Sequence, residues 1–283
     1  MIAVIGEASP RVEDRKFLTG AGKYLDDLEF PHISHAVFIR SPHAHARILS
    51  ISTIIAKEMP GVLDIITADD VELSKLNALK PFVQENPNTG EAFSFVEQPL
   101  LARNVVRYQG EPVVLVVAET VAQALDASEV VEIEYSPLPH VLDSKEAANP
   151  DSIKLNSQLD ENIAVKWNTG NSQEIENVFN SADNVVKLTV QNQRIVTNPM
   201  EPRGVVAEWN ISTGRYTLYG SSQNIHVMRT CVADMLGVAE ASVRFIAPDV
   251  GGGFGSKNFC YTEYGLIAWM SKRLGRPVKW IAS

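Results

Sequence analysis

The chain is poor in cysteine: its 283 residues include only Cys231 and Cys260, and no CxxC spacing occurs. Iron–sulfur clusters of the Cys₄ kind therefore cannot form from this polypeptide alone, and a redox partner that carries one would be a separate chain. Because free cysteine is among the most buried residue types, we interpret both residues as small packing residues of helices rather than as reactive thiols.

Long apolar runs and an excess of positive charge are also missing. No stretch approaches the roughly 20 apolar residues of a membrane span. The net charge of −9 disfavours binding to nucleic acid or to an anionic membrane surface. The opening sequence, MIAVIGEASPRVEDR, has neither a basic n-region nor a long apolar h-region. We therefore expect no secretory signal and a cytoplasmic location.

Hydrophobic residues make up 45% of the chain, which suffices for the cores of two ordinary domains. Strand–helix–strand patterns recur in the first half, and the run VVLVVA at residues 113–118 is typical of a strand buried on both faces. Prolines interrupt the polar segment that follows this half. The sequence thus predicts an α/β (mixed α+β) fold with a lead-in at residues 1–19, an α/β domain at 20–136, a surface linker at 137–162 and a second domain at 163–283.

The second predicted domain starts with a helix over EIENVFNSA and continues with a long alternating strand, NVVKLTVQNQRIV. The dipeptide Thr213-Gly214 predicts the turn of a hairpin. A helix over IHVMRTCVADML comes next, with Ser222 as its expected cap and Gly237 as its stop. These elements precede the most unusual segment of the chain.

That segment is GGGFGSKN, residues 251–258, between a predicted strand at 243–250 and a predicted helix at 261–274 that Gly275 and Pro277 end. At a strand-to-helix turn, backbone N–H groups point outward and the helix dipole favours negative charge. Glycine also lets a flat or anionic ligand approach the main chain. The segment predicts a ligand-binding loop, with a purely structural glycine turn as the alternative.

Spacing argues against the two commonest ligands of glycine-rich loops. Counted from Gly251, a P-loop would require Gly-Lys-Ser/Thr where Ser256, Lys257 and Asn258 stand. The dinucleotide fingerprint G-x-G-x-x-G fails as well, because Ser256 occupies its last glycine position. ATP and NAD are therefore disfavoured.

Two polar groupings are given structural roles. Glu201 and Arg203 flank a proline, and we interpret them as a buried ion pair that holds a turn rather than as catalytic groups. His43 and His45 would share one face of a strand, but no cysteine or acidic residue lies near them in the sequence. We therefore expect no metal site there.

The motif GGGFGSK, together with SSQNIH upstream of it and PRVEDRKFLTGAGKYLDD near the start, resembles a known family. It is the molybdenum-binding large subunit of the xanthine dehydrogenase, aldehyde oxidase and carbon monoxide dehydrogenase family, and the match extends over nearly the whole chain. The resemblance implies a hammerhead-type α/β domain at residues 20–136. It also implies the truncated, N-terminal part of a molybdopterin-binding domain at 163–283.

The resemblance further implies a cofactor site. Gln223 would donate toward the oxo oxygen of a molybdenum–pterin cofactor, either molybdopterin or its cytosine dinucleotide. The metal would be lined by the loop residues Gly252, Gly253, Phe254 and Gly255, without direct ligation by any side chain. The family's catalytic Glu lies downstream, so no catalytic residue is expected within this chain.

One position departs from the family pattern, because purine- and aldehyde-oxidising members often carry a Glu where Asn258 stands. Asn258 would contact substrate without a carboxylate, which argues against purines. The implied reaction is hydroxylation of an aldehyde or N-heterocycle with oxygen from water, or oxidation of carbon monoxide. Electrons would pass to partner chains that carry [2Fe-2S] and FAD, in a higher-order oligomer.

The predicted strand at the end of the sequence, VKWIAS, has no turn after it. We therefore expect an N-terminal fragment or a truncated homologue that is inactive alone. The alternative is a non-catalytic scaffold that binds the redox partner subunits.

Overall fold

The computed structural model of the chain describes residues 6, 8, 10–81, 83–86, 90–93, 95–167 and 169–283. Part of the predicted lead-in, residues 1–5, 7 and 9, therefore lies outside the described residues. The strands are β1 (Ser34–Arg40), β2 (Ala46–Ser52), β3 (Val62–Ile66), β4 (Val105–Val106), β5 (Pro112–Ala118), β6 (Glu132–Pro137), β7 (Gly204–Asn210), β8 (Arg215–Gly220), β9 (Val243–Ile246) and β10 (Val278–Ile281).

The α-helices are α1 (Asp14–Leu18), α2 (Ile54–Lys57), α3 (Ala68–Leu73), α4 (Val121–Glu129), α5 (Ser144–Ala147), α6 (Ser172–Ser181), α7 (Ile225–Leu236) and α8 (Thr262–Leu274). Short 3-10 turns add η1 (Leu25–Asp27) and η2 (Glu240–Ser242). Over the part of the chain that the structure describes, no helix is long and apolar enough to span a bilayer.

Seven strands form one sheet in the order β3-β5-β1-β10-β7-β8-β9, and β4, β2 and β6 form a second sheet. Strand β10 pairs in parallel with β1 and antiparallel with β7, so it joins the two halves of the large sheet. The predicted mixed α/β class is confirmed. Because the large sheet contains strands from both sides of residues 137–162, the division of the chain into separate domains stays a prediction.

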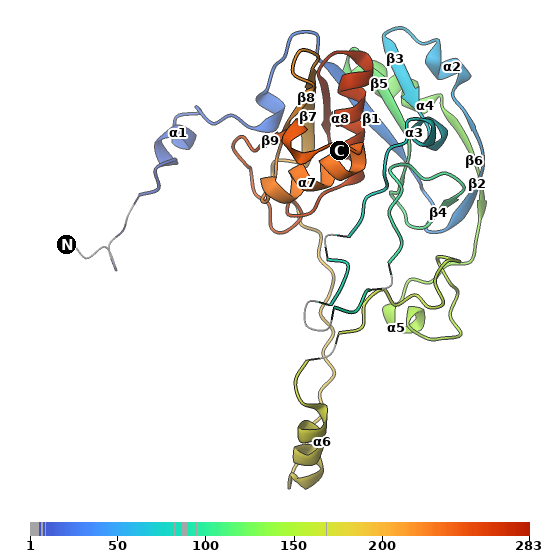
Figure 1. Cartoon of the computed structure of the whole chain (residues 1–283), viewed down its shortest axis with the longest axis vertical. Helices are drawn as coiled ribbons and strands as arrows, with labels where there is room; N and C mark the ends of the chain where they lie inside the picture. The colour runs from blue at the N-terminus through green and yellow to red at the C-terminus, as the bar shows by residue number, and fades with distance from the viewer. Residues whose placement is uncertain are drawn as a thin grey trace.

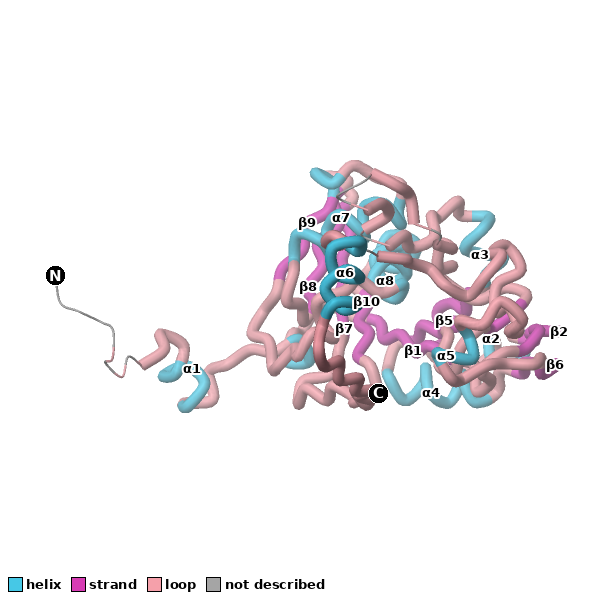
Figure 2. The backbone as a smooth tube through the Cα atoms, turned by 90° about the horizontal axis from the view of Figure 1, so that it is seen from below, coloured by secondary structure: helices cyan, strands magenta, loops and turns pink. Residues whose placement is uncertain are grey.

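Strand β5 shows why one stretch of the sequence is entirely apolar. All its residues are buried, and it lies between β3 and β1 in the large sheet. Leu115 and Val117 belong to the core that contains α8, whereas Val114 and Val116 belong to the core that contains α4. Successive side chains of a strand point to opposite faces. With helices on both sides of the sheet, every position of β5 must be apolar (Figure 2).

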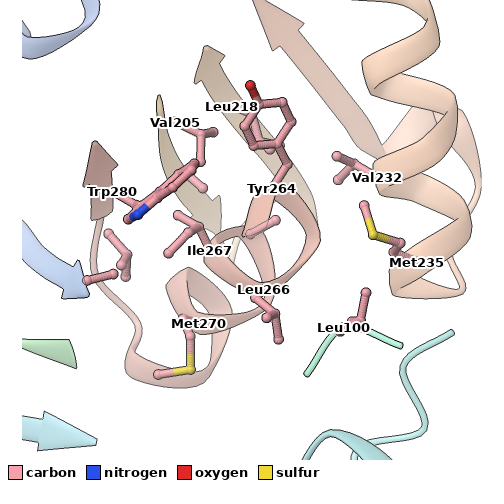
Figure 3. Packing of buried hydrophobic residues seen from close by; sticks show 14 of the residues in the cluster. Leu100, Val205, Leu218, Val232, Met235, Tyr264, Leu266, Ile267, Met270 and Trp280 are labelled. Carbon is pink, nitrogen blue, oxygen red and sulfur yellow. The ribbon is translucent and has the colours of Figure 1, made fainter. Parts of the chain in front are cut away.

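Helices α7 and α8 lie side by side and cover the half of the sheet built from β7, β8 and β9 (Figure 1). A Cβ on Gly265 would stand 2.8 Å from the sulfur of Met235, so this glycine lets the two helices approach closely. Around them, Leu218, Val232 and Leu266 pack in the same core (Figure 3). This core fixes α7 relative to α8, and the two ends of the glycine-rich loop are fixed with them.

Both predicted helix stops are confirmed. Gly237 and Gly275 take the left-handed conformation, with φ of 65° and 64°. The predicted cap of α7 is wrong, because Asn224 rather than Ser222 accepts the hydrogen bond from the Val227 amide, at 3.3 Å. A capping side chain must reach the third residue of the helix, and Asn224 stands directly before the first.

The predicted strand over NVVKLTVQNQRIV is also wrong. Residues 184–199 pair with no other segment of the described chain, and Val186, Leu188 and Val190 are 90%, 84% and 77% exposed. The preceding helix α6 forms as predicted but extends away from the body of the molecule (Figure 1). Alternation of apolar residues gives an extended segment one apolar face, but a hydrogen-bonded β-ladder also requires a neighbouring strand.

The predicted linker, residues 137–162, contains the single-turn helix α5, which the prolines had argued against. Asp143 caps it by accepting hydrogen bonds from the Lys145 and Glu146 amides, both at 2.9 Å. Pro150 follows the helix rather than interrupting it. A proline outside the helical turn leaves the hydrogen bonds of that turn intact.

Strand β8, which lies between β7 and β9, provides a test of stability. Leu218 is fully buried, and we expect Leu218→Ala to lower the free energy of unfolding by about 2–5 kcal/mol because it leaves a cavity. Leu73→Ala is the control, since Leu73 is 83% exposed. Denaturant unfolding of both variants checks the difference, and equal losses would contradict the packing described here.

Candidate functional site

The glycine-rich loop joins β9 to α8 through a backbone that glycine makes possible. Gly252 and Gly255 have φ of +92° and +89°, a region that residues with side chains rarely adopt. Phe254 has a φ of 47°, and its side chain is 72% exposed. A bulky residue in the left-handed region costs energy and persists where its surroundings hold it there. The loop therefore presents an aromatic ring outward on a constrained turn.

Hydrogen bonds within the loop fix this turn. The amide and the hydroxyl of Ser256 both donate to the Gly253 carbonyl at 2.9 Å. The Asn258 amide donates to the Gly255 carbonyl at 3.1 Å, and the Tyr261 hydroxyl donates to the Ser256 carbonyl at 2.6 Å. The loop is thus a set of closed turns tied to the start of α8.

Gln223, just before α7, lies directly against this loop. Its backbone N–H donates to the Lys257 carbonyl at 3.0 Å, and its side-chain Oε1 accepts from the backbone N–H of Gly255 at 3.0 Å. A Cβ on Gly253 would stand 2.4 Å from Cδ of Gln223, so only glycine leaves room for the carboxamide. With Oε1 held as an acceptor, the Nε2 group is the end of the side chain that remains to donate to a ligand.

The predicted ion pair between Glu201 and Arg203 is wrong, because the cationic partner of Glu201 is Lys257. The Nζ of Lys257, whose side chain is fully buried, lies 2.8 Å from Oε2 of Glu201. A lysine cannot be buried without a partner for its charge, and Glu201 is the acid within its reach. Arg203 instead stacks on Tyr261, with the guanidinium carbon 3.7 Å from the ring centroid.

The Glu201 carboxylate collects further donors from distant parts of the chain. Oε2 accepts from the Gly251 amide at 2.8 Å and from the Ser221 hydroxyl, while Oε1 accepts from the Leu25 amide at 3.1 Å. These contacts link the segment before β1, the end of β8 and both ends of the glycine run. Hydrogen bonds to a charged group are the stronger kind, so Glu201 holds the loop in place.

These contacts also set the pKa of Glu201. Burial by itself would raise it, but hydrogen bonds from Lys257, Ser221, Gly251 and Leu25 outweigh burial. The pKa therefore lies below the ordinary value of 4.5. The carboxylate stays ionised near neutral pH, which agrees with the prediction that Glu201 is structural rather than a base.

A pocket of about 700 Å³ opens beside the loop. Gly251 and Phe254 line it from the loop, and Glu201 forms part of its wall. The remaining lining residues come from the segments at 24–27 and 198–202, and they include Met200, which is 99% exposed. The pocket is large enough for a small organic molecule and offers both apolar and acidic surface.

Of the predicted site residues, the structure brings Gln223, Gly253 and Gly255 into direct contact, while Phe254 and Asn258 lie exposed on the same loop. Gly252 supplies one of the left-handed turns next to them. The roles of all these residues toward a cofactor or substrate stay predictions. Gly255, which has open space where a Cβ would stand, and the remaining Nε2 donor of Gln223 fit a ligand that approaches the main chain.

Sequence reasoning missed the part played by Lys257. The one sign of this role in the sequence is the position of Lys257 just after the glycine run. Because the P-loop spacing fails, the sequence offered no reason for a lysine there. His43 packs against the Tyr135 ring at 5.0 Å between centroids, and His45 lies 2.6 Å from the Pro139 carbonyl oxygen. Among the described residues, no cluster of His, Cys, Asp or Glu could hold a metal ion.

Comparison with known families gives two matches that together cover most of the chain. Residues 19–139 match the family described as aldehyde oxidase and xanthine dehydrogenase, a/b hammerhead domain. Residues 155–283 match the molybdopterin cofactor-binding domain. The second match contains Gln223, Glu201 and the whole glycine-rich loop.

Individual relatives agree with both matches. The chain is 38% identical to the nicotine 6-hydroxylase large subunit of Paenarthrobacter nicotinovorans, over 98% of this chain and 33% of that protein. It is 35% identical to the carbon monoxide dehydrogenase large chain of Afipia carboxidovorans, over 96% of this chain and 34% of that protein. The chain thus spans about a third of the length of these relatives.

Solved structures share the fold. Quinoline 2-oxidoreductase from Pseudomonas putida 86 superimposes with a TM-score of 0.86 at 35% identity, over 98% of this chain and 34% of that one. Reconstituted CO dehydrogenase from Oligotropha carboxidovorans superimposes with a TM-score of 0.88 at 35% identity, over 98% of this chain and 35% of that one.

The Glu201 contacts predict a pH effect on stability. A carboxylate whose pKa is lowered on folding stabilises the protein above its unfolded pKa, and this contribution is lost as the pH falls through the folded pKa. We expect unfolding to become easier below about pH 4.5, and Glu201→Gln to remove part of that dependence. Denaturation measured from pH 3 to 7 checks it, and an unchanged slope in Glu201→Gln would contradict it.

Lys257 offers a second test. Lys257→Met leaves an uncompensated carboxylate in the site and should lower stability by about 3–5 kcal/mol, because breaking a buried pair is costly. The exposed pair of Lys166 and Glu161 supplies the control, since Lys166→Met should cost about 1 kcal/mol or less. The double variant Glu201→Gln with Lys257→Met should recover part of the loss in denaturant unfolding. No recovery would mean that the charge pair is not what stabilises the loop.

Proposed function

Because the chain belongs to the aldehyde oxidase and xanthine dehydrogenase family and carries its molybdopterin cofactor-binding domain, we propose that Gln223 and residues 252–255 form part of a molybdenum-cofactor site. The full protein is then the large subunit of a molybdenum hydroxylase. The observation that supports this most directly is the carboxamide of Gln223 fixed against Gly253 and Gly255. All three residues of that contact lie in the matched cofactor-binding domain.

Each residue has a defined part in this proposal. Gln223 presents its Nε2–H groups as fixed donors toward the bound cofactor, since its oxygen is occupied by the Gly255 amide. Gly252 supplies a left-handed turn, and Gly253 leaves room for the Gln223 carboxamide. Gly255 has open space where the cofactor can approach the main chain, and the exposed ring of Phe254 shields the cofactor from water. Glu201 and Lys257 hold the loop so that these groups are positioned before any ligand binds.

When bound, the cofactor supplies two-electron oxidation of a substrate with oxygen from water. We propose a substrate among N-heterocycles, aldehydes and carbon monoxide, which the names of nicotine 6-hydroxylase, quinoline 2-oxidoreductase, aldehyde oxidoreductase and carbon monoxide dehydrogenase support. Asn258, exposed on the loop, is the residue of this chain that we assign to substrate contact. An amide there can donate and accept but carries no charge, which favours a neutral substrate over one that needs a carboxylate partner.

Electrons are proposed to leave through partner chains that carry an iron–sulfur cluster and FAD; the two cysteines of these 283 residues do not suffice for a Cys₄ cluster. One relative is named as a subunit of the 6-hydroxypseudooxynicotine dehydrogenase complex, which supports a multi-subunit assembly. We keep a cytoplasmic location and a higher-order oligomer as parts of the proposal. The catalytic base is assigned to the portion of the relatives that these residues do not span.

Cofactor content of the full-length protein, purified with its neighbouring subunits, tests the site. Gly253→Val should lose molybdenum and pterin together, because a side chain at position 253 collides with Gln223 and shifts the backbone of the glycine-rich loop itself. Gly214→Ala is the control, since Gly214 also has a positive φ of +65° but lies in the β7–β8 turn with open space around it. Full cofactor content in Gly253→Val would contradict the assignment of the glycine-rich loop to the cofactor site.

Gln223→Ala tests the donor separately. It should keep the cofactor and the fold, because Gln223 is exposed apart from its loop contacts, yet slow turnover roughly 100-fold as for removal of one fixed donor. A wild-type rate would remove Gln223 from the site. A wild-type protein that contains no molybdenum but binds redox subunits would instead support a scaffold.

A further inference from the structure

The only two cysteines of the sequence meet in one pocket of the folded chain. Cys231 lies in α7, as expected, whereas Cys260 lies just before α8 rather than in a helix. Both are free and partly exposed, and both line a pocket of about 240 Å³. Cys231 and Cys260 are 29 positions apart in the sequence, so the tertiary structure brings them to one pocket.

The environment makes the two thiols unequal. A hydrogen bond with the Cys260 thiol lowers the pKa of Cys231. The same contact, together with burial, raises the pKa of Cys260 well above its usual range. The Cys260 sulfur lies 3.8 Å from the Tyr261 carbonyl oxygen, which is an alternative acceptor for its single S–H proton. A thiol with a lowered pKa at a pocket wall is suited to attack an incoming disulfide. Its protonated neighbour is suited to attack the resulting mixed disulfide in the second step.

The other residues of the pocket suit an incoming anionic disulfide. Lys80 lines it, and the exposed ring of Phe259 stands at its edge. Among the described residues, Lys80 pairs with Glu97, with 3.8 Å between Nζ and Oε1. A cation at the pocket wall attracts small anionic disulfides, whereas the Asp234 carboxylate acts in the opposite direction and raises the pKa of Cys231.

We propose that Cys231 and Cys260 are a redox-active pair that forms a reversible disulfide by exchange with a small disulfide, Cys231 attacking and Cys260 resolving. The Cys231 thiolate attacks one sulfur of the small disulfide, forms a mixed disulfide and releases one thiolate. Cys260 then loses its proton and attacks the Cys231 sulfur, which releases the second thiolate. The dithiol is oxidised by two electrons, and one small disulfide is reduced to two thiols.

The disulfide bond would link the two segments that form the candidate cofactor site, which are α7 and the glycine-rich loop. Cys231 lies in the helix that begins beside Gln223, and Cys260 follows Asn258 at the end of the glycine-rich loop. Oxidation would tie α7 to that end of the loop and so alter the contact between Gln223 and Gly255. This consequence, unlike the thiol pair itself, rests on the proposed function.

Peptide mapping of the full-length protein in its complex tests the pair. The folded complex is incubated with glutathione disulfide, its remaining thiols are alkylated after denaturation in acid, and unreduced peptides are identified by mass spectrometry. We expect a peptide that joins residues 231 and 260 and that disappears after treatment with dithiothreitol. In Cys260→Ser, glutathione should remain attached to Cys231, and in Cys231→Ser, Cys260 should stay reduced.

Other outcomes overturn the proposal. If both thiols are alkylated quantitatively after exposure to glutathione disulfide, they do not pair. If glutathione attaches to Cys260 rather than to Cys231, the assigned order of attack is wrong. A joined peptide that forms from the denatured chain but not from the folded one would show that the native pocket prevents the reaction.

Molybdenum content and turnover are measured on the same samples. Oxidation should slow turnover several-fold with molybdenum retained, and reduction should restore it, whereas both serine variants should be insensitive. A complex without molybdenum would count against the proposed function while leaving the mapping result valid. Unchanged turnover in a fully oxidised, molybdenum-loaded complex would refute the link between the thiols and the site.

Discussion

The buried charge pair of Glu201 and Lys257 is the interaction on which the candidate site depends. Removing two charges from water is unfavourable, and their attraction offsets this only when the remaining hydrogen-bonding positions are also filled. Here the carboxylate also receives donors from Leu25, Ser221 and Gly251. One side chain therefore connects the N-terminal segment, the end of β8 and both ends of the glycine run. Those segments are far apart in the sequence, so the pair converts a flexible loop into a defined surface.

The packing of α7 against α8 completes this arrangement. Gln223 precedes the first helix and the glycine-rich loop precedes the second, so the distance between donor and loop follows from the distance between the helices. Gly265 against Met235 permits this close packing, because a larger residue at position 265 would require the Met235 side chain or the helices to shift. The contact between Gln223 and Gly253 is then a consequence of the core beneath it. This is how a hydrophobic interface positions a polar group.

The large sheet has a similar connecting role for the whole chain. Strand β10 comes last in the sequence and is inserted between β1 and β7, so the regions that match the two families share one sheet. In contrast, residues 184–196 form no strand ladder in the described chain and expose Val186, Leu188 and Val190, and α6 carries exposed Val178 and Phe179. The chain spans about a third of its relatives' length.

The sequence by itself determined the local structure and the identity of the loop. The apolar run of β5, the turn at Gly214 and the helix stops at Gly237 and Gly275 depend on neighbours in the chain, which a sequence displays. The motif GGGFGSK likewise identified the family before any contact was known. Only the tertiary structure decided which charges pair, because Glu201 finds Lys257 rather than Arg203, and whether residues 184–196 gain a neighbouring strand. Ion pairs and strand ladders join distant segments, and their partners are set by packing rather than by sequence spacing.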